Sequence, residues 1–210
     1  EMPPKEESRL SDAERGAILV DYNFSFPTLA HFYDLQRIAE HYYLVMLPSW
    51  TGMMDTNLLT FATLDEPVLC MAFEQKDFDF IASLQTNLRP VQVSANFFCD
   101  HRVFAPRQDL DKDIDVICVA AWGTYKRHER LLKALAEVKR RRGQLKAAFV
   151  GYPSDLTKGD IELQARYHGL EDNIEFHEHL SPEQVNDLYA RSRVNVLWSR
   201  REGTPRTPIE

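Results

Sequence analysis

The second half of the chain alternates short apolar runs with amphipathic stretches, and this alternation restricts the possible fold more than any other feature. The runs predict strands and the stretches between them predict helices, in the order 114–121 (strand), 125–142 (helix), 145–150 (strand), 158–168 (helix), 173–176 (strand), 182–190 (helix) and 194–198 (strand). Gly143 is expected to end the first of these helices, and Ser181 with Pro182 to begin the last. Strands and helices at this spacing form right-handed crossovers between parallel strands. We therefore expect an α/β domain with a doubly wound parallel sheet.

The first half also predicts an α/β arrangement, with shorter and less regular elements. Its apolar runs predict strands at 17–22, 42–47, 58–64, 67–73 and 91–95. Helical spacing predicts one helix that begins at Pro27 and includes Ala39, and a second over 78–84. No glycine-rich turn follows the first predicted strand, so a nucleotide site of that kind is not expected in this half.

A polar segment that contains Pro106 separates the two halves and marks the expected domain boundary. We predict a polar lead-in over 1–15, a short α/β domain over 16–104, a linker over 105–113 and a second domain over 114–210. The length of 210 residues is enough for two small domains.

The composition argues against several classes of function. A net charge of −7 disfavours nucleic acid as the main partner, because phosphate binding requires a surplus of lysine and arginine. No apolar run is long enough to span a bilayer, and the charged start has no signal-peptide core. The three cysteines are scattered and show no metal-ligand spacing, so we expect no metal site and a reducing, cytoplasmic setting.

The loop that follows the first predicted strand of the second half combines Gly123 with the cations Lys126 and Arg127. Backbone amides at a helix N-terminus, together with the Lys126 ammonium, form a site for an anion such as phosphate. A cation in the first helical turn opposes the helix dipole, and a bound phosphate would account for it. The alternative is that Lys126, Arg127 and Arg130 only solvate the helix.

Two glutamates follow the last predicted strand, with seven residues between them. Glu202 falls on the loop at the carboxyl end of that strand, and Glu210 falls about two helical turns further on. Ligands bind at this edge of an open α/β sheet, and carboxylates there accept hydrogen bonds from sugar or ribose hydroxyls. The alternative is a solvated turn with two surface acids. Gly151, after the second predicted strand, allows the close approach of a ligand or belongs only to a turn.

A basic run closes the first predicted helix of the second half and consists of Lys139, Arg140, Arg141 and Arg142. Positive charge at a helix C-terminus is favourable because it complements the helix dipole. A weak peripheral contact with an anionic membrane is the alternative interpretation.

An ordered set of short motifs spans the chain from Asp100 to its end. The set comprises Asp100-x-x-x-Phe104-x-Pro106, Tyr125-Lys126-Arg127-His128 with the apolar helix after it, Phe149-Val150-Gly151, Gly169-Leu170, Leu180-Ser181-Pro182-Glu183, and Glu202-Gly203-Thr204-Pro205 with Ile209-Glu210. This set resembles the C-terminal, donor-binding domain of retaining glycosyltransferases with the GT-B fold, specifically glycosyltransferase family four. The resemblance covers about half of the chain.

The resemblance implies two Rossmann-like domains of GT-B type and a hexosyltransferase that moves a sugar from a nucleotide-diphosphate sugar to an unknown acceptor hydroxyl. It implies catalytic roles for Lys126, on the donor pyrophosphate, and for Glu202, on the transferred sugar. The remaining donor-binding residues that it implies are Gly123, Arg127, Gly151, Gly203, Thr204 and Glu210, with Glu210 at the ribose. Members of the family retain the anomeric configuration and need neither a metal ion nor a cofactor.

The chain departs from the family pattern in four places, one of which is the absence of the glycine expected near Glu178. An arginine is usual five residues before the lysine, where this chain has Ala121. The first half is short for an acceptor domain, and the family continues past the position of Glu210, so we expect a truncated, incomplete donor domain. The alternative function is a non-catalytic GT-B-like module that binds a nucleotide or a partner. A different nucleotide-sugar enzyme on the same fold, such as an epimerase, is a third alternative.

Overall fold

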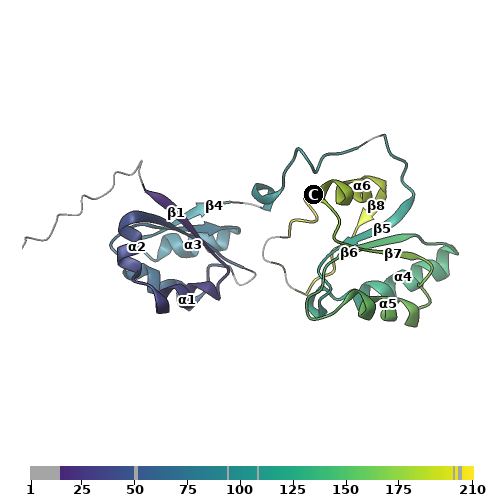
Figure 1. Ribbon diagram of the computed structural model, residues 1–210, viewed down its shortest axis with the longest axis horizontal. Helices are drawn as coiled ribbons and strands as arrows, with labels where there is room; N and C mark the ends of the chain where they lie inside the picture. Colours follow the sequence, from purple (N-terminus) through teal and green to yellow (C-terminus); the bar gives the residue numbers. More distant parts are fainter. Residues whose placement is uncertain (1–14, 50–51, 94, 108, 201, 203–204) are drawn as a thin grey trace, which may run out of the picture. The chain divides into compact units, whose positions relative to one another are not determined.

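The computed structural model describes residues 15–49, 52–93, 95–107, 109–200, 202 and 205–210. The chain forms two compact units, Glu1–Ser94 and Ala95–Glu210, and each contains its own four-stranded parallel sheet (Figure 1). The predicted α/β class with parallel sheets is therefore confirmed. Residues 105–107 and 109–113, predicted as a linker, form neither helix nor strand. The predicted domain boundaries stay predictions.

The first unit is wound in one direction. Its sheet consists of β1 (Gly16–Asp21), β2 (Tyr42–Leu47), β3 (Val68–Ala72) and β4 (Leu88–Gln92), paired in that order. The helical segments between the strands are α1 (Ser25–Phe32), α2 (Leu35–His41), the 3-10 helix η1 (Thr56–Thr63) and α3 (Gln75–Ser83). Right-handed crossovers that all advance in one direction lie on the same face of the sheet. Accordingly, Phe26, Phe61 and Ile81 from these segments join Leu44 and Val68 of the strands in a single core.

Three predictions for the first unit are wrong. The strand expected over 91–95 is β4, which lies at Leu88–Gln92. The single helix expected from Pro27 is divided, because Asp34 begins a new helix and its carboxylate accepts a hydrogen bond from the Arg37 N–H at 3.1 Å. The strand expected over 58–64 is the 3-10 helix η1. Leu58 and Phe61 are its buried residues, and their spacing of three matches a 3-10 turn rather than the alternation of a strand.

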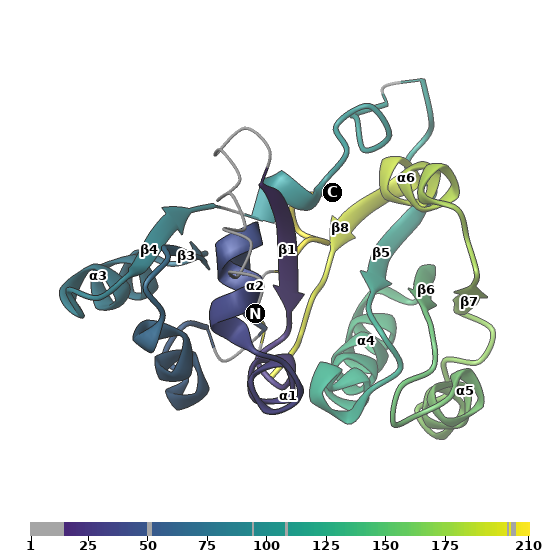
Figure 2. The same cartoon turned by 60° about the vertical axis from the view of Figure 1, so that its left-hand side comes forward.

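The second unit is wound in both directions, as predicted. Its strands β5 (Ile114–Val119), β6 (Ala147–Gly151), β7 (Ile174–Glu178) and β8 (Ser192–Asn195) pair in the order β7-β6-β5-β8, all parallel (Figure 2). Its helical segments are η2 (Ala95–Phe98), η3 (Thr124–Lys126), α4 (His128–Arg142), α5 (Lys158–Tyr167) and α6 (Pro182–Arg191). Helices α4 and α5 cover one face of the sheet and α6 covers the other (Figure 1).

The ends of these helices show why the predicted boundaries held in most places. Gly143 adopts φ 77° and ends α4, and α5 and α6 begin with capping boxes at Thr157 and Ser181. Two boundaries were wrong. The helix predicted over 125–142 is interrupted at Arg127, and the last strand, predicted over 194–198, is β8 at Ser192–Asn195.

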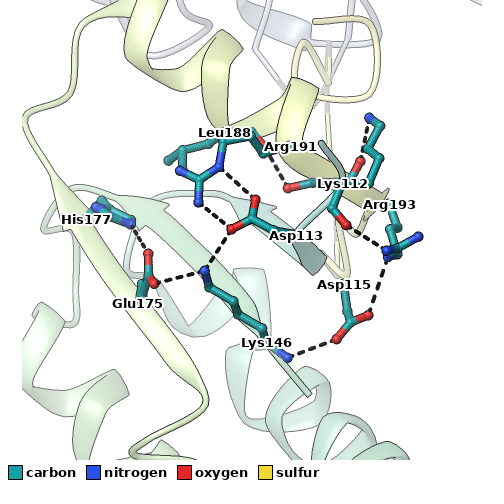
Figure 3. Close-up of polar contacts among 10 residues, drawn as sticks. Lys112, Asp113, Asp115, Lys146, Glu175, His177, Leu188, Arg191 and Arg193 are labelled. Carbon is teal, nitrogen blue, oxygen red and sulfur yellow. Dashed lines mark hydrogen bonds and ion pairs between the residues drawn. The ribbon is translucent and has the colours of Figure 1, made fainter. Parts of the chain in front are cut away.

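Ion pairs join the amino ends of the strands in the second unit (Figure 3). Asp113, directly before β5, pairs with Arg191 at the end of α6 at 2.7 Å and with Lys146, directly before β6, at 2.9 Å. Lys146 also lies 3.6 Å from Glu175 on β7. Hydrogen bonds from Arg191 and Lys146 hold the pKa of the Asp113 carboxyl well below its usual range. This network fixes the edge of the sheet that lies opposite the carboxyl ends of the strands.

The basic run at the end of α4 makes local contacts. Lys139 donates a hydrogen bond to the carbonyl of Gly169 at 2.8 Å, and Arg140 and Arg141 pair with Glu137 at 2.6 and 2.5 Å. Across the ranges that the structure describes, no helix combines the length and apolarity needed to cross a bilayer. The membrane contact expected at Lys139, Arg140, Arg141 and Arg142 stays a prediction.

Candidate functional site

The winding of the second unit changes direction beside β5. The chain passes from β5 outward to β6 and β7, then returns through α6 to place β8 on the free side of β5. Loops that leave the carboxyl ends of β5 and β8 therefore diverge from neighbouring strands. In open α/β sheets, ligands bind in the crevice at such a switch point.

A buried tryptophan shapes the loop after β5. The Trp122 side chain is fully buried, and its indole N–H donates a hydrogen bond to the carboxylate of Glu178 at 2.6 Å. The ring packs against His128 and Phe176. The Trp122 backbone N–H donates to the carbonyl of Tyr152 at 2.8 Å. The loop after β5 is thereby attached to the loop after β6 and to the end of β7, which limits where the next residues can lie.

Lys126 and Glu202 meet at the switch point. The Lys126 ammonium lies 2.5 Å from Oε1 of Glu202, and the two side chains are 13% and 25% exposed. The ammonium also lies 5.2 Å from the centroid of the Tyr125 ring. A backbone hydrogen bond from the Arg200 N–H to the Tyr125 carbonyl, at 2.8 Å, joins the loop after β8 to the loop after β5. The structure thus brings together the two residues for which catalytic roles were expected.

Arg127 adopts a left-handed backbone conformation, with φ 56° and ψ 41°, and stands as the N-cap of α4. This conformation separates the 3-10 turn that carries Lys126 from the helix that follows. A non-glycine residue in this region is uncommon and strained. Its side chain forms no hydrogen bond or ion pair with any residue that the structure describes. The sharp turn presents the preceding Lys126 toward Glu202 instead of along the helix.

His128, the first residue of α4, is only 2% exposed. The imidazole lies against Trp122 and Phe149, and neither ring nitrogen has a hydrogen-bond partner within the described ranges. Burial lowers the pKa of His128 to about 4, and the nearby Lys126 ammonium adds to the lowering. The ring is therefore neutral at physiological pH.

A comparison with known families identifies the family of this chain. Residues 102–210, which make up more than half of the chain, match the family described as Glycosyl transferases group 1. The chain belongs to this family. No curated protein matches the chain.

Solved structures with a similar fold include two proteins that are named as transferases. The pneumococcal O-GlcNAc transferase GtfA, in complex with UDP and GlcNAc, has a TM-score of 0.61 at 14% identity, over 82% of this chain and 36% of that one. Sucrose-phosphate synthase from Thermosynechococcus elongatus has a TM-score of 0.63 at 15% identity, over 92% and 52%. The lipopolysaccharide outer core galactosyltransferase WaaB, in its apo form, has 0.54 at 15% identity, over 93% and 53%. The chain spans about a third to a half of the length of these proteins. At such identities the likeness confirms the GT-B fold alone.

Two glycines of the second unit, Gly123 and Gly151, were expected to contact a ligand. At Gly151, an added Cβ would lie 2.3 Å from the carbonyl oxygen of Ala120 and 2.9 Å from two carbons of the Trp122 indole. At Gly123, an added Cβ would lie 2.5 Å from the ring of Tyr125. The chain itself therefore requires a glycine at Gly151, because backbone occupies the space. Direct contact of either glycine with a ligand stays a prediction.

Asp155 is a site residue that the sequence did not single out. Its carboxylate accepts hydrogen bonds from the Thr124 N–H at 3.0 Å and from the Thr124 hydroxyl at 2.5 Å. The hydrogen bond from the Thr124 hydroxyl is the main cause of the lowered pKa of Asp155. An aspartate two residues after the Gly151-Tyr152-Pro153 turn is the available signal, but turns contain aspartate for many reasons. Here the side chain fixes the start of the turn that carries Lys126.

Glu210, the second of the two glutamates predicted to bind the donor, contacts Tyr189. The Tyr189 hydroxyl donates a hydrogen bond to Oε2 of Glu210 at 3.3 Å. Burial, followed by the negative charge of Glu210, raises the pKa of Tyr189 well above its usual range. The Asn195 side chain donates to the carbonyl of Thr207 at 2.7 Å, which ties this segment to β8. Gly203 and Thr204 lie outside the described residues.

Proposed function

We propose that this chain binds a nucleotide-diphosphate sugar at the carboxyl ends of β5 and β8 and transfers its hexosyl group to an acceptor hydroxyl with retention of configuration, as in glycosyltransferase family four. Membership of the group 1 family supports the reaction class. The observation that carries the site is the contact of Lys126 with Glu202 at the point where the winding reverses. A cation and a carboxylate in one crevice suit the two ends of such a donor, since phosphate attracts the ammonium and sugar hydroxyls donate to the carboxylate.

The roles of the individual groups follow from charge. In the reaction, the bond between the anomeric carbon and the β-phosphate oxygen breaks, and its electron pair stays on the phosphate. The acceptor oxygen bonds to the same carbon, and its proton passes to the departing phosphate. The Lys126 ammonium stabilises the charge that develops on that phosphate. Glu202 accepts hydrogen bonds from the hydroxyls of the transferred sugar, and no covalent bond to it is required.

The ion pair also indicates how donor binding begins. Without a donor, Glu202 neutralises Lys126. A diphosphate that binds Lys126 competes with this carboxylate and displaces it, so that Glu202 becomes available for sugar hydroxyls. Gly123, Arg127, Gly151, Gly203 and Thr204 complete the proposed phosphate contacts. Glu210 contacts the ribose through Oε1, because Oε2 already accepts from Tyr189.

Isothermal titration with UDP, GDP and ADP tests the site. Lys126→Ala should weaken the binding of whichever diphosphate binds best by about ten-fold or more, because a charge-assisted hydrogen bond is worth roughly 1.5–3 kcal/mol. Lys133→Ala, which removes an exposed lysine from α4, the helix that follows Lys126, is the matched control and should bind normally. Equal binding by Lys126→Ala and the unchanged chain would remove the proposed phosphate site.

A non-catalytic nucleotide-binding module is the second candidate, favoured by Ala121. Its side chain is buried, at the position where the family usually has a second phosphate-binding arginine. Binding of a nucleotide without transfer from any UDP-, GDP- or ADP-sugar would favour this candidate.

We further propose that transfer requires no metal ion and takes place in the cytoplasm. Full activity in excess EDTA is the expected result, and activity restored only by a divalent cation would contradict it.

A further inference from the structure

Helix α4 concentrates positive charge in an acidic chain. It carries six lysines and arginines against two glutamates, whereas the whole chain has a net charge of −7. Cations in the last turn of a helix complement its dipole, and this effect accounts for the run that ends α4. It does not account for Arg130 and Lys133, which lie earlier in the helix. Such an uneven distribution of charge attracts a partner that is itself negative.

Nearby acids neutralise only part of this charge. Glu137 lies 2.6 Å from Arg140 and 2.5 Å from Arg141. Hydrogen bonds from Arg140 and Arg141 lower the pKa of Glu137 to about 2, so its single negative charge offsets one of the two arginines. Both arginine side chains are 71% exposed. Exposed ion pairs contribute little energy, so an external anion can compete for both guanidinium groups.

Two apolar side chains are exposed on the neighbouring helix. Leu163 and Tyr167 of α5 are 62% and 84% exposed, whereas Ile161 and Ala165 of the same helix are fully buried in the core. Residues four apart lie on one side of a helix, so Leu163 and Tyr167 both face away from the sheet. One exposed leucine is ordinary. Leucine and tyrosine beside several arginines form the combination of side chains found at membrane–water interfaces.

The packing of α4 against α5 brings the two features together. Both helices lie side by side on the same face of the sheet (Figures 1 and 2). Lys139 donates a hydrogen bond to the Gly169 carbonyl at 2.8 Å, so the basic end of α4 lies next to the end of α5 that carries Tyr167. Glu162 and Glu171 lie on the other flank of α5, where they line a cavity against β7. The acids near α5 therefore do not separate the arginines from the exposed apolar side chains.

We propose that the outer surface of α4 and α5 docks on an anionic lipid bilayer. The residues of this lipid-docking face are Lys133, Arg140, Arg141, Arg142, Leu163 and Tyr167. The cations contact lipid phosphates, and the two apolar side chains enter the headgroup region. A bilayer accounts for Leu163 and Tyr167 better than a nucleic acid does, because a phosphodiester backbone offers a leucine no apolar environment. The docking does not depend on the transfer reaction proposed above.

Co-sedimentation with vesicles tests the proposal. The chain should sediment with an equal mixture of phosphatidylcholine and phosphatidylglycerol, and not with phosphatidylcholine alone. Binding should largely disappear in about 1 M NaCl, where the Debye length falls to about 3 Å. The double variant Arg140→Gln/Arg141→Gln should bind about twenty-fold more weakly, since each basic residue near such a surface contributes about five-fold. Tyr167→Ala should weaken binding by about five-fold, because an apolar contact is lost.

The matched control is Lys76→Gln/Arg102→Gln, which removes the same charge from outside α4 and α5. These two side chains are 61% and 80% exposed, and each pairs with a nearby acid, as Arg140 and Arg141 do. The control should bind vesicles as the unchanged chain does. Thermal unfolding followed by circular dichroism confirms that each variant keeps its fold, which is expected because every substituted side chain is exposed.

Each outcome decides the question. Binding that falls in Arg140→Gln/Arg141→Gln and in Tyr167→Ala, but not in the control, supports the lipid-docking face. No binding to the mixed vesicles overturns it, as does equal binding by all variants or an equal loss in the control. Binding to a DNA duplex or to heparin through the same arginines, without vesicle binding, would assign the face to another polyanion and would also overturn it.

Discussion

Substitution of Gly151 by alanine should destabilise the second unit strongly. The added Cβ would lie 2.3 Å from the Ala120 carbonyl oxygen and 2.9 Å from the Trp122 indole. A real Cβ atom essentially never comes within 3.0 Å of such a neighbour, so the added Cβ would be at least 0.7 Å too close to the carbonyl oxygen. Gly151 and Ala120 belong to paired strands or their direct continuation, so neither backbone can move without breaking ladder hydrogen bonds. We expect a loss of about 3 kcal/mol, at the upper end of the usual range for overpacking.

Urea unfolding monitored by far-UV circular dichroism measures this loss in free energy of unfolding. A decrease of that size should also lower Tm by roughly 10 °C or more. Gly159→Ala is the matched control, because an added Cβ there meets only the Thr157 hydroxyl oxygen, at 3.7 Å. This control lies in the first turn of α5 and should raise stability by up to about 1 kcal/mol, since alanine is the better helix former.

The result separates two roles for Gly151. If the glycine is required by the chain itself, Gly151→Ala unfolds at lower urea concentration whether or not a nucleotide is present. Unfolding at the same urea concentration as the unchanged chain, with loss of UDP, GDP and ADP binding, would refute the steric reasoning. The space beside the Gly151 Cα would then be needed by the ligand, and not by the neighbouring strand.

Three further predictions concern α4, α5 and the buried imidazole. Arg127→Gly should raise the free energy of unfolding by about 1 kcal/mol, because glycine adopts φ 56° without strain; a lower urea midpoint would contradict this. Thr157→Ala should lower the free energy of unfolding by about 1 kcal/mol, because the capping box of α5 is lost. An unchanged urea midpoint would argue against that cap. His128 has its pKa lowered from 6.5 to about 4 in the folded state, so the unfolded chain takes up the proton first as pH falls. Between about pH 6.5 and pH 4 the unchanged chain should therefore lose up to about 3 kcal/mol more stability than His128→Gln, and parallel pH profiles would disprove burial of a neutral ring.

The second unit could be predicted from the sequence because its hydrophobic pattern, its caps and its topology agree. Gly143 and Ser181 end and begin helices where local chemistry requires it. Lys126 and Glu202 were placed in one crevice because loops at the carboxyl ends of parallel strands meet there, and the structure puts them in contact. The expected ligand roles of both residues stay predictions.

Other features depend on contacts between distant residues and left no local signal. Asp155 acquires its role only because its loop lies beside Thr124. Leu58 and Phe61 are apolar in either a strand or a 3-10 helix, and the core of the first unit decides between the two. The positive φ of Tyr22 is imposed by the buried Asn23, since an isolated tyrosine avoids that conformation. Tertiary packing overrides local preference at each of these positions.

The position of β8 sets the order in which the chain can acquire its chemistry during synthesis. Strands β5, β6 and β7 are complete by Glu178, but β5 gains its second neighbour only when Ser192–Asn195 has been made. A nascent chain released or stalled before that point carries Lys126 with no carboxylate opposite it and leaves an open edge on β5. Such an intermediate is exposed to strand-to-strand aggregation. Ribosome stalling or premature termination before Ser192 should therefore give insoluble chains, although β5, β6 and β7 have already been translated.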